Sequence, residues 1–136
     1  MNANRNRKNR VKGFTLIELI IVISIIMILS SIAIPAYTRH LVAAREAVMK
    51  EDLYSMRNAI DQYSQDKNKG PKGLDDLVTA GYLHAIPKDP ITNSTETWQT
   101  VQEDVLLDPA QTDPGITDVH SGSNATALDG TAYNTW

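Results

Sequence analysis

Apolar and polar residues divide the chain into an apolar segment and a longer amphipathic one. From Phe14 to Ile34 there are 21 residues, and Glu18 is the only charged side chain among them. At a rise of 1.5 Å per residue, a helix of that length is about 31 Å long, enough to cross the hydrocarbon core of a bilayer. We therefore predict a membrane-spanning helix here, which we delimit as residues 14–36.

The apolar pattern continues beyond this segment at helical spacing. Pro35 falls inside the predicted helix, where it removes one backbone hydrogen bond and should kink it. A cluster of helix breakers at residues 68–71 should end it, so we predict one helix from about Thr15 to Asp66. Steps of 7, 4, 3, 4 and 3 residues mark one helical face, formed by Val42, Met49, Leu53, Met56, Ile60 and Tyr63.

The polar side of the same helix carries opposite charges one turn apart. Glu46 precedes Lys50 by four residues, and Arg57 precedes Asp61 by the same step. Side chains at this spacing are neighbours on a helix surface. We therefore predict two exposed ion pairs on this side.

Shorter elements follow the long helix. Residues 74–80 have the pattern of a helix, with acidic side chains in the first turn that favour the positive end of the helix dipole. Residues 98–105, 116–120 and 132–136 have the pattern of strands, separated by turn residues. We predict an α+β domain over residues 37–136, in which a small antiparallel sheet packs on the outer half of the long helix.

Charge is distributed unevenly along the chain. Residues 1–13 contain five basic side chains and no acidic one, whereas the remainder contains eight basic and sixteen acidic side chains. A basic block before an apolar span stays on the cytoplasmic side of a membrane, so the domain that follows should lie on the other side. An acidic domain is repelled by nucleic-acid phosphates. We therefore predict no nucleic-acid partner.

An ordinary secretory signal peptide is the simplest alternative for the N-terminus. Residues 31–33 or 34–36 could serve as small-residue cleavage sites. The apolar run, however, exceeds the 7–15 residues usual for a signal core, and Glu18 interrupts its start. An uncleaved membrane anchor is the second alternative.

Signals for catalysis are weak. The chain has no cysteine, which excludes disulfides and thiolate metal sites. It has neither a Gly-x-Ser-x-Gly motif nor a glycine-rich phosphate loop, and its three histidines are far apart in the sequence. We predict that the protein is not an enzyme.

The junction Gly13-Phe14-Thr15-Leu16-Ile17-Glu18, followed by the apolar helix and Pro35, resembles the N-terminus of type IV pilins and type II secretion pseudopilins. The resemblance implies a pilin-like fold and a leader, residues 1–13, that a prepilin peptidase removes after Gly13. It also implies N-methylation of the new amine of Phe14 and polymerisation through the N-terminal helices. A carboxylate at the centre of a membrane helix costs roughly 2.5–3.5 kcal/mol. The resemblance implies that the Glu18 carboxylate pairs with the Phe14 amine of a neighbouring subunit.

Later motifs narrow the resemblance to the major pseudopilin of type II secretion systems. It implies a structural subunit of a pseudopilus filament, anchored in a bacterial inner membrane with its C-terminal domain in the periplasm. The implied partners are further copies of the chain, membrane lipid before assembly, an inner-membrane assembly platform and minor pseudopilins. The motifs are Asp61-Gln62-Tyr63, Gly73-Leu74 with Leu77, Gly81-Tyr82-Leu83, Ile86 to Pro90, Asp129-Gly130 and Tyr133 to Trp136.

Major pseudopilins commonly bind calcium in the C-terminal loop that many type IV pilins close with a disulfide. By this resemblance, the candidate ligands are Asp118, Ser121, Ser123, Asn124 and Asp129. Their side chains carry the hard oxygen donors that calcium takes, although their spacing is not that of an EF-hand. The alternative is a polar surface loop whose Ser, Asn and Asp residues form turns.

Two other functions remain open at this stage. A type IV pilus major pilin would use the same N-terminus to build an extracellular fibre. A monomeric, membrane-anchored binding domain would require neither leader processing nor Glu18.

Overall fold

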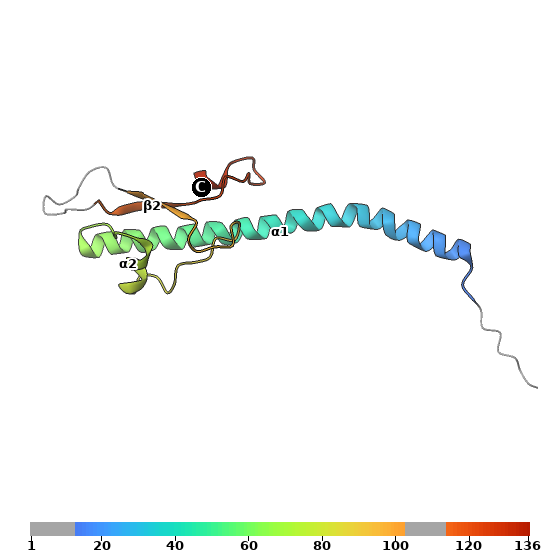
Figure 1. The fold of residues 1–136 in the computed structure, drawn as a ribbon, viewed down its shortest axis with the longest axis horizontal. Coiled ribbons are helices and arrows are strands. Elements are labelled where there is room, and N and C mark those ends of the chain that lie inside the picture. The colour runs from blue at the N-terminus through green and yellow to red at the C-terminus, as the bar shows by residue number, and fades with distance from the viewer. Residues whose placement is uncertain (1–12, 103–113) are drawn as a thin grey trace, which may run out of the picture. The chain divides into compact units, whose positions relative to one another are not determined.

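The computed structural model describes residues 13–102 and 114–136 (Figure 1). It contains helix α1 (Leu16–Lys67), helix α2 (Leu74–Thr79), strand β1 (Trp98–Gln102), strand β2 (Ile116–Ser121) and a 3-10 helix, η1 (Tyr133–Thr135). The chain divides into two compact units, Met1–Arg39 and His40–Trp136. Residues 1–12 of the predicted leader lie outside the described residues.

The first unit contains the N-terminal part of α1. Its large apolar side chains are exposed, by fractions that run from 41% at Val22 to 77% at Leu16. Among the described residues, α1 is the one helix long and apolar enough to cross a membrane. Pro35 lies inside α1 and does not end it. The hydroxyl of Thr38 donates to the Pro35 carbonyl oxygen at 2.9 Å, so this hydroxyl has its hydrogen-bond partner within the helix.

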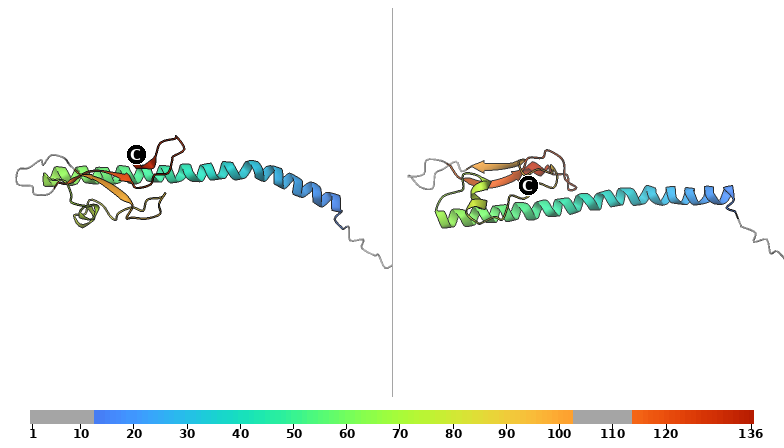
Figure 2. Two further views of the ribbon diagram at one scale, coloured as in Figure 1. Left: turned by 45° about the horizontal axis from the view of Figure 1, so that its top comes forward. Right: turned by 60° about the horizontal axis from the view of Figure 1, so that its bottom comes forward.

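The core of the second unit forms on the predicted stripe of α1. Met49, Leu53, Met56 and Ile60 are buried, while Val42 and Tyr63 are half-buried. Figure 2 shows the strands on one side of the green part of α1. The prediction of a sheet packed on this face is confirmed. The stripe packs against Leu74, Leu77, Leu83, Trp98, Ile116, Val119, Ala127 and Tyr133.

The sheet has two antiparallel strands, β1 and β2, with Trp98 opposite Ser121 and Gln102 opposite Ile116. A bulge between Val101 and Gln102 interrupts the register. Residues 103–105 of the first predicted strand lie outside the described residues.

The prediction of a third strand over residues 132–136 is wrong. This segment forms η1, preceded by a single bridge between Thr126 and Ala132. In a 3-10 helix, side chains three residues apart lie on the same side. The rings of Tyr133 and Trp136 accordingly meet edge to face with their centroids 5.1 Å apart. Packing of these two rings, rather than strand pairing, determines the local conformation.

The backbone of the loop between α1 and α2 closely approaches the backbone at the start of β2. The amide of Ile116 donates to the carbonyl oxygen of Pro71 at 2.8 Å. Beside it, a Cβ atom on Gly115 would lie 2.4 Å from the Cα atom of Gly70. Only glycine therefore fits at this crossing.

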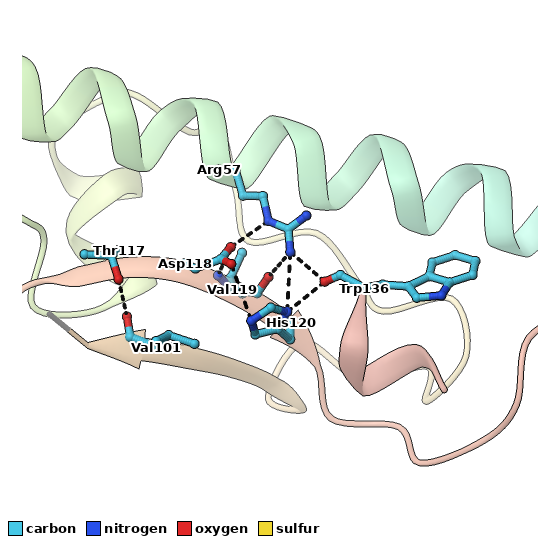
Figure 3. Close-up of polar contacts among 7 residues, drawn as sticks. All are labelled: Arg57, Val101, Thr117, Asp118, Val119, His120 and Trp136. Atoms are coloured by element: carbon cyan, nitrogen blue, oxygen red, sulfur yellow. Dashed lines mark hydrogen bonds and ion pairs between the residues drawn. The ribbon is translucent and has the colours of Figure 1, made fainter. Parts of the chain in front are cut away.

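Arg57 connects α1 to β2 and to the C-terminal segment (Figure 3). Its Nε donates to Asp118 Oδ1 at 2.6 Å. Its Nη2 donates to the main-chain oxygens of Val119 at 3.0 Å and Trp136 at 2.6 Å. His120 joins the same group, with Nδ1 2.7 Å from the Trp136 oxygen and Nε2 3.4 Å from Asp118 Oδ2.

The two predicted i,i+4 ion pairs on α1 are wrong. Arg57 binds Asp118 instead of Asp61. Glu46 Oε1 accepts hydrogen bonds from the Tyr133 hydroxyl at 2.9 Å and the Leu128 amide at 2.8 Å. Glu46 and Arg57 are half-buried at the margin of the stripe, where partners from the C-terminal segment are within reach.

The environment of Asp118 alters its acidity. Burial raises the pKa of its carboxyl, but hydrogen bonds from Arg57 and from the Val119 amide outweigh burial and hold the pKa below the ordinary 3.8. A depressed folded-state pKa stabilises the fold at pH values above the unfolded pKa, and this stabilisation is lost as the pH falls through the folded value.

Gly115→Ala should destabilise the second unit by about 1–3 kcal/mol, because the added methyl group meets backbone that cannot move away freely. Gly73→Ala is the matched control, since a Cβ there meets nothing within 4 Å; we expect it to cost under about 1 kcal/mol. Denaturant unfolding of the fragment His40–Trp136 measures the free energy of unfolding of both variants. Equal stability of the two variants would contradict the close approach.

Arg57→Gln and Asp118→Asn should be non-additive in a double-mutant cycle. Because both side chains are more than a third exposed, solvent screening limits their coupling to on the order of 1 kcal/mol. The coupling should be lost as the pH falls through the folded-state pKa of Asp118, which lies below the ordinary 3.8, because Asp118 is then protonated in the folded as well as the unfolded state. Urea unfolding at neutral and acidic pH measures it. If Arg57 proved to be coupled to Asp61 and not to Asp118, the result would contradict this prediction and support an ion pair within the helix.

Candidate assembly site and C-terminal segment

The N-terminus of α1 is closed by a capping box. Thr15 stands in the N-cap position, and its Oγ1 accepts a hydrogen bond from the Glu18 amide at 3.3 Å. The Thr15 amide in turn points at Glu18 Oε2 at 3.5 Å. Thr-x-x-Glu before an apolar run is the sequence signature of this motif. We did not predict it, although Thr15 and Glu18 can be recognised from the sequence alone.

The capping box holds the Glu18 carboxylate at the first turn of α1, beside the amide of Thr15, the residue that follows Phe14. Both side chains are exposed, and within the described residues no ion pair involves Glu18. The positive end of the helix dipole favours a carboxylate at this place. Gly13 and Phe14 precede the helix, and a Cβ on Gly13 would meet nothing within 4 Å. The predicted cleavage junction is therefore open to solvent.

The predicted calcium ligands in and after β2 already have protein partners. Asp118 is paired with Arg57. Ser121 is buried, and its hydroxyl donates to Asp89 Oδ2 at 2.6 Å. Ser123 donates its amide to Ser121 Oγ at 3.1 Å and accepts the Ala125 amide on its own hydroxyl. These residues form consecutive turns rather than a shell of free oxygens.

Two further candidates lie in the turns that follow. Asn124 Oδ1 accepts a hydrogen bond from Asn134 at 2.9 Å. Asp129 Oδ1 accepts from the Thr131 amide and hydroxyl, and these bonds lower the pKa of the Asp129 carboxyl. The described residues hold no group of three or more His, Cys, Asp or Glu side chains placed to hold a metal ion. Calcium binding therefore stays a prediction.

Asp89 is a structural residue that the sequence analysis treated only as part of a turn. Its side chain is fully buried. Oδ1 accepts the amides of Ile91 at 2.7 Å and Thr92 at 3.2 Å, while Oδ2 accepts the Ser121 hydroxyl. Asp followed by Pro is a turn signal, but the long-range bond to Ser121 has no local signature. Asp89 thereby joins the loop before β1 to the end of β2.

A cavity of about 420 Å³ opens in the second unit between α1 and the C-terminal segment. Lys50, Tyr54 and Arg57 line it from α1, and Asp129 and Trp136 line it from the opposite wall. The Lys50 ammonium lies 4.4 Å from the centre of the Trp136 ring, a cation–π contact. The site is aromatic and amphipathic.

Comparison with known proteins agrees with this geometry. The model of the prokaryotic N-terminal methylation motif matches residues 8–34, which include the junction and the capping box. The type II secretion system core protein G of Aeromonas hydrophila is 33% identical over 103 residues, covering 64% of this chain and 72% of the relative. Its counterpart from Pectobacterium carotovorum subsp. carotovorum is 31% identical over 118 residues, covering 75% and 70%.

Fimbrial proteins are also related. The type IV major fimbrial protein FimA of Dichelobacter nodosus is 35% identical over 88 residues, covering 65% of this chain but 56% of the relative. No solved structure gives a significant match. Because the core G proteins align over more than two thirds of their own length, the chain belongs to the family of type II secretion system core protein G, the major pseudopilins.

Proposed function

We propose that this protein is a structural subunit that polymerises into the pseudopilus filament of a type II secretion apparatus. The observation that carries the proposal is the exposed apolar part of α1, which begins with a methylation motif and holds one acidic side chain. An apolar helix of this length requires lipid or other apolar helices around it. Before assembly the surroundings would be an inner membrane, and after assembly the helices of neighbouring subunits.

Processing would prepare the chain for assembly. A prepilin peptidase would cut after Gly13, leaving the whole of α1 attached and giving Phe14 a free, then methylated, amine. The basic leader would stay in the cytoplasm and the second unit would lie in the periplasm, as expected from the positive-inside rule. The assembly platform and minor pseudopilins would be its further partners.

Glu18 would supply the specificity of helix packing. In the capping box its carboxylate interacts with the first turn of its own helix. The Phe14 amine of a neighbouring subunit would offer a full positive charge instead. Two charges that are each costly in lipid would then neutralise one another on assembly.

A surface fibre of the type IV pilus class is the second candidate, and the relationship to FimA supports it. That alignment spans a smaller share of the relative than the alignments with core protein G do. We therefore favour the pseudopilus.

The mature protein should begin at Phe14, with a methylated amine. Intact-mass measurement of membrane-derived protein checks this. Gly13→Val should retain the leader without disturbing the fold, because a Cβ atom at Gly13 meets nothing within 4 Å in the described part of the chain. A mature chain beginning at Ile34 or Tyr37 would indicate an ordinary signal peptide and would exclude the filament.

Glu18→Gln separates the charge of this residue from its capping role. Glutamine at this position still completes a capping box, but it cannot neutralise a neighbouring ammonium. We expect normal membrane insertion and loss of polymer, measured by filament sedimentation and microscopy. Glu96→Ala, which changes an exposed loop carboxylate, should leave polymer unchanged. Normal polymer from Glu18→Gln would show that capping, and not charge pairing, is the function of Glu18.

A further inference from the structure

The cavity beside α1 has the composition of a protein-binding surface. Trp136 is fixed within it, because its Nε1 donates to Thr131 Oγ1 at 2.7 Å and its ring meets Tyr133 edge to face. Tyr54, from α1, is 68% exposed at the rim. Trp, Tyr and Arg dominate the energetics of protein interfaces when they surround a preformed pocket. We call this cavity, lined by Lys50, Tyr54, Arg57 and Trp136 among others, the Trp136 pocket.

A second apolar feature lies on another side of the same helix. Leu41, Ala44 and Val48 follow one another at steps of three and four residues, which places them on one face. All three are exposed, Leu41 at 43% and Val48 at 52%. Val48 and Lys50 are two residues apart, about 200° around an α-helix. This surface, the Val48 ridge, therefore faces nearly opposite to the Trp136 pocket.

The Trp136 pocket and the Val48 ridge lie on opposite sides of α1, an arrangement that suits head-to-tail association of subunits. Such heterologous contacts produce open helical filaments when the rotation between subunits does not close a ring. The proposed function requires an open filament of this kind. In sequence along α1, the Val48 ridge also follows directly after the apolar segment to which that function assigns subunit packing.

The pocket and the ridge carry opposite charges, Lys50 in the pocket and Glu51 beside the ridge. The Lys50 ammonium contacts the Trp136 ring and has no carboxylate within 4 Å in residues 13–102 and 114–136. Asp129, which also lines the pocket, lies further away, although Lys50 helps to lower the pKa of its carboxyl. Glu51 is exposed and follows Val48 by three residues, beside the ridge. A neighbour whose ridge entered the pocket would bring a carboxylate toward Lys50.

We propose, on the basis of the filament function, that the Trp136 pocket of one subunit receives the Val48 ridge of the next, with Lys50 facing Glu51 of that neighbour. The occupant of the pocket is thus a second copy of this chain. The other exposed apolar side chain near the pocket, Leu128, belongs to the loop that forms the pocket wall. The Leu128 amide binds Glu46, one turn before Lys50, so this loop lies on the pocket side of α1 and not on the side of the Val48 ridge.

Cysteine cross-linking in assembled filaments tests the contact, because the chain has no native cysteine. Val48→Cys combined with Thr135→Cys places one thiol on the ridge and one in the pocket wall. Oxidation should produce a ladder of oligomers on denaturing gels, since each subunit links to two neighbours. Mixed filaments of the two single variants should stop at dimers. Thr135→Cys with Asp61→Cys is the control pair, because Asp61 lies one turn beyond Arg57 on the pocket side, and it should give no ladder.

Charge exchange is the second test. Lys50→Glu and Glu51→Lys should each lower the polymerised fraction severalfold, and the double variant should restore it. Both side chains are exposed, so each variant should fold. Lys50→Glu should lose a little thermal stability, because it removes the cation–π contact with Trp136. Filaments without the ladder, or a double variant no better than the single ones, would overturn the contact and leave the filament function standing. Absence of filaments from the parent chain would instead overturn the filament function.

Discussion

The second unit depends on the burial of one stripe of α1. The chain has no cysteine and therefore no disulfide to constrain the segment that follows the helix. Met49, Leu53, Met56, Ala59 and Ile60 instead provide a continuous apolar surface, and α2, both strands and η1 each contribute a side chain that covers it. Full burial of a Leu or Met side chain is worth about 1.5–3 kcal/mol, so burial of the stripe contributes several kcal/mol to the stability of the second unit.

Polar groups at the margins of this stripe determine where the covering segment lies. Arg57 satisfies carbonyl oxygens of Val119 and Trp136, and Glu46 binds the Tyr133 hydroxyl and the Leu128 amide. Apolar burial alone does not fix a register, because it is non-directional. Hydrogen bonds are directional, and a donor left without its partner in a half-buried place costs about 1–3 kcal/mol. Together they select one arrangement of the C-terminal segment.

Periodic features of the sequence predicted most of the fold. The spacing of Met49, Leu53, Met56 and Ile60 gave the buried face of α1, and its bounds agree with the prediction to one residue at each end. Two of three strands were also found. Helical and strand periodicity suffices for these elements because the signal repeats over many residues.

Long-range polar contacts could not be predicted in the same way. Spacing alone suggested that Arg57 would bind Asp61, but a guanidinium can choose among several carboxylates, and the fold brings Asp118 closer. The hydrogen bond between Ser121 and Asp89 could not be predicted either, because the two residues lie 32 positions apart in the sequence. The third predicted strand failed because Tyr133 and Trp136 stand three residues apart, a spacing that fits a 3-10 turn and not the two-residue alternation of a strand. The capping box of Thr15 and Glu18, by contrast, was present in the sequence and was overlooked.

The sequence separation of the Arg57 contacts has a consequence for the order of events in the cell. Its partners lie 61 to 79 residues further along the chain, so none of these bonds can form until the last segment is available. Contacts that close such long loops form late, because the entropy of loop closure must be overcome before they contribute. We expect a chain that is still crossing a membrane to stay unfolded beyond α1, and so to remain threadable. Completion of the fold would then coincide with arrival of the C-terminal segment on the far side.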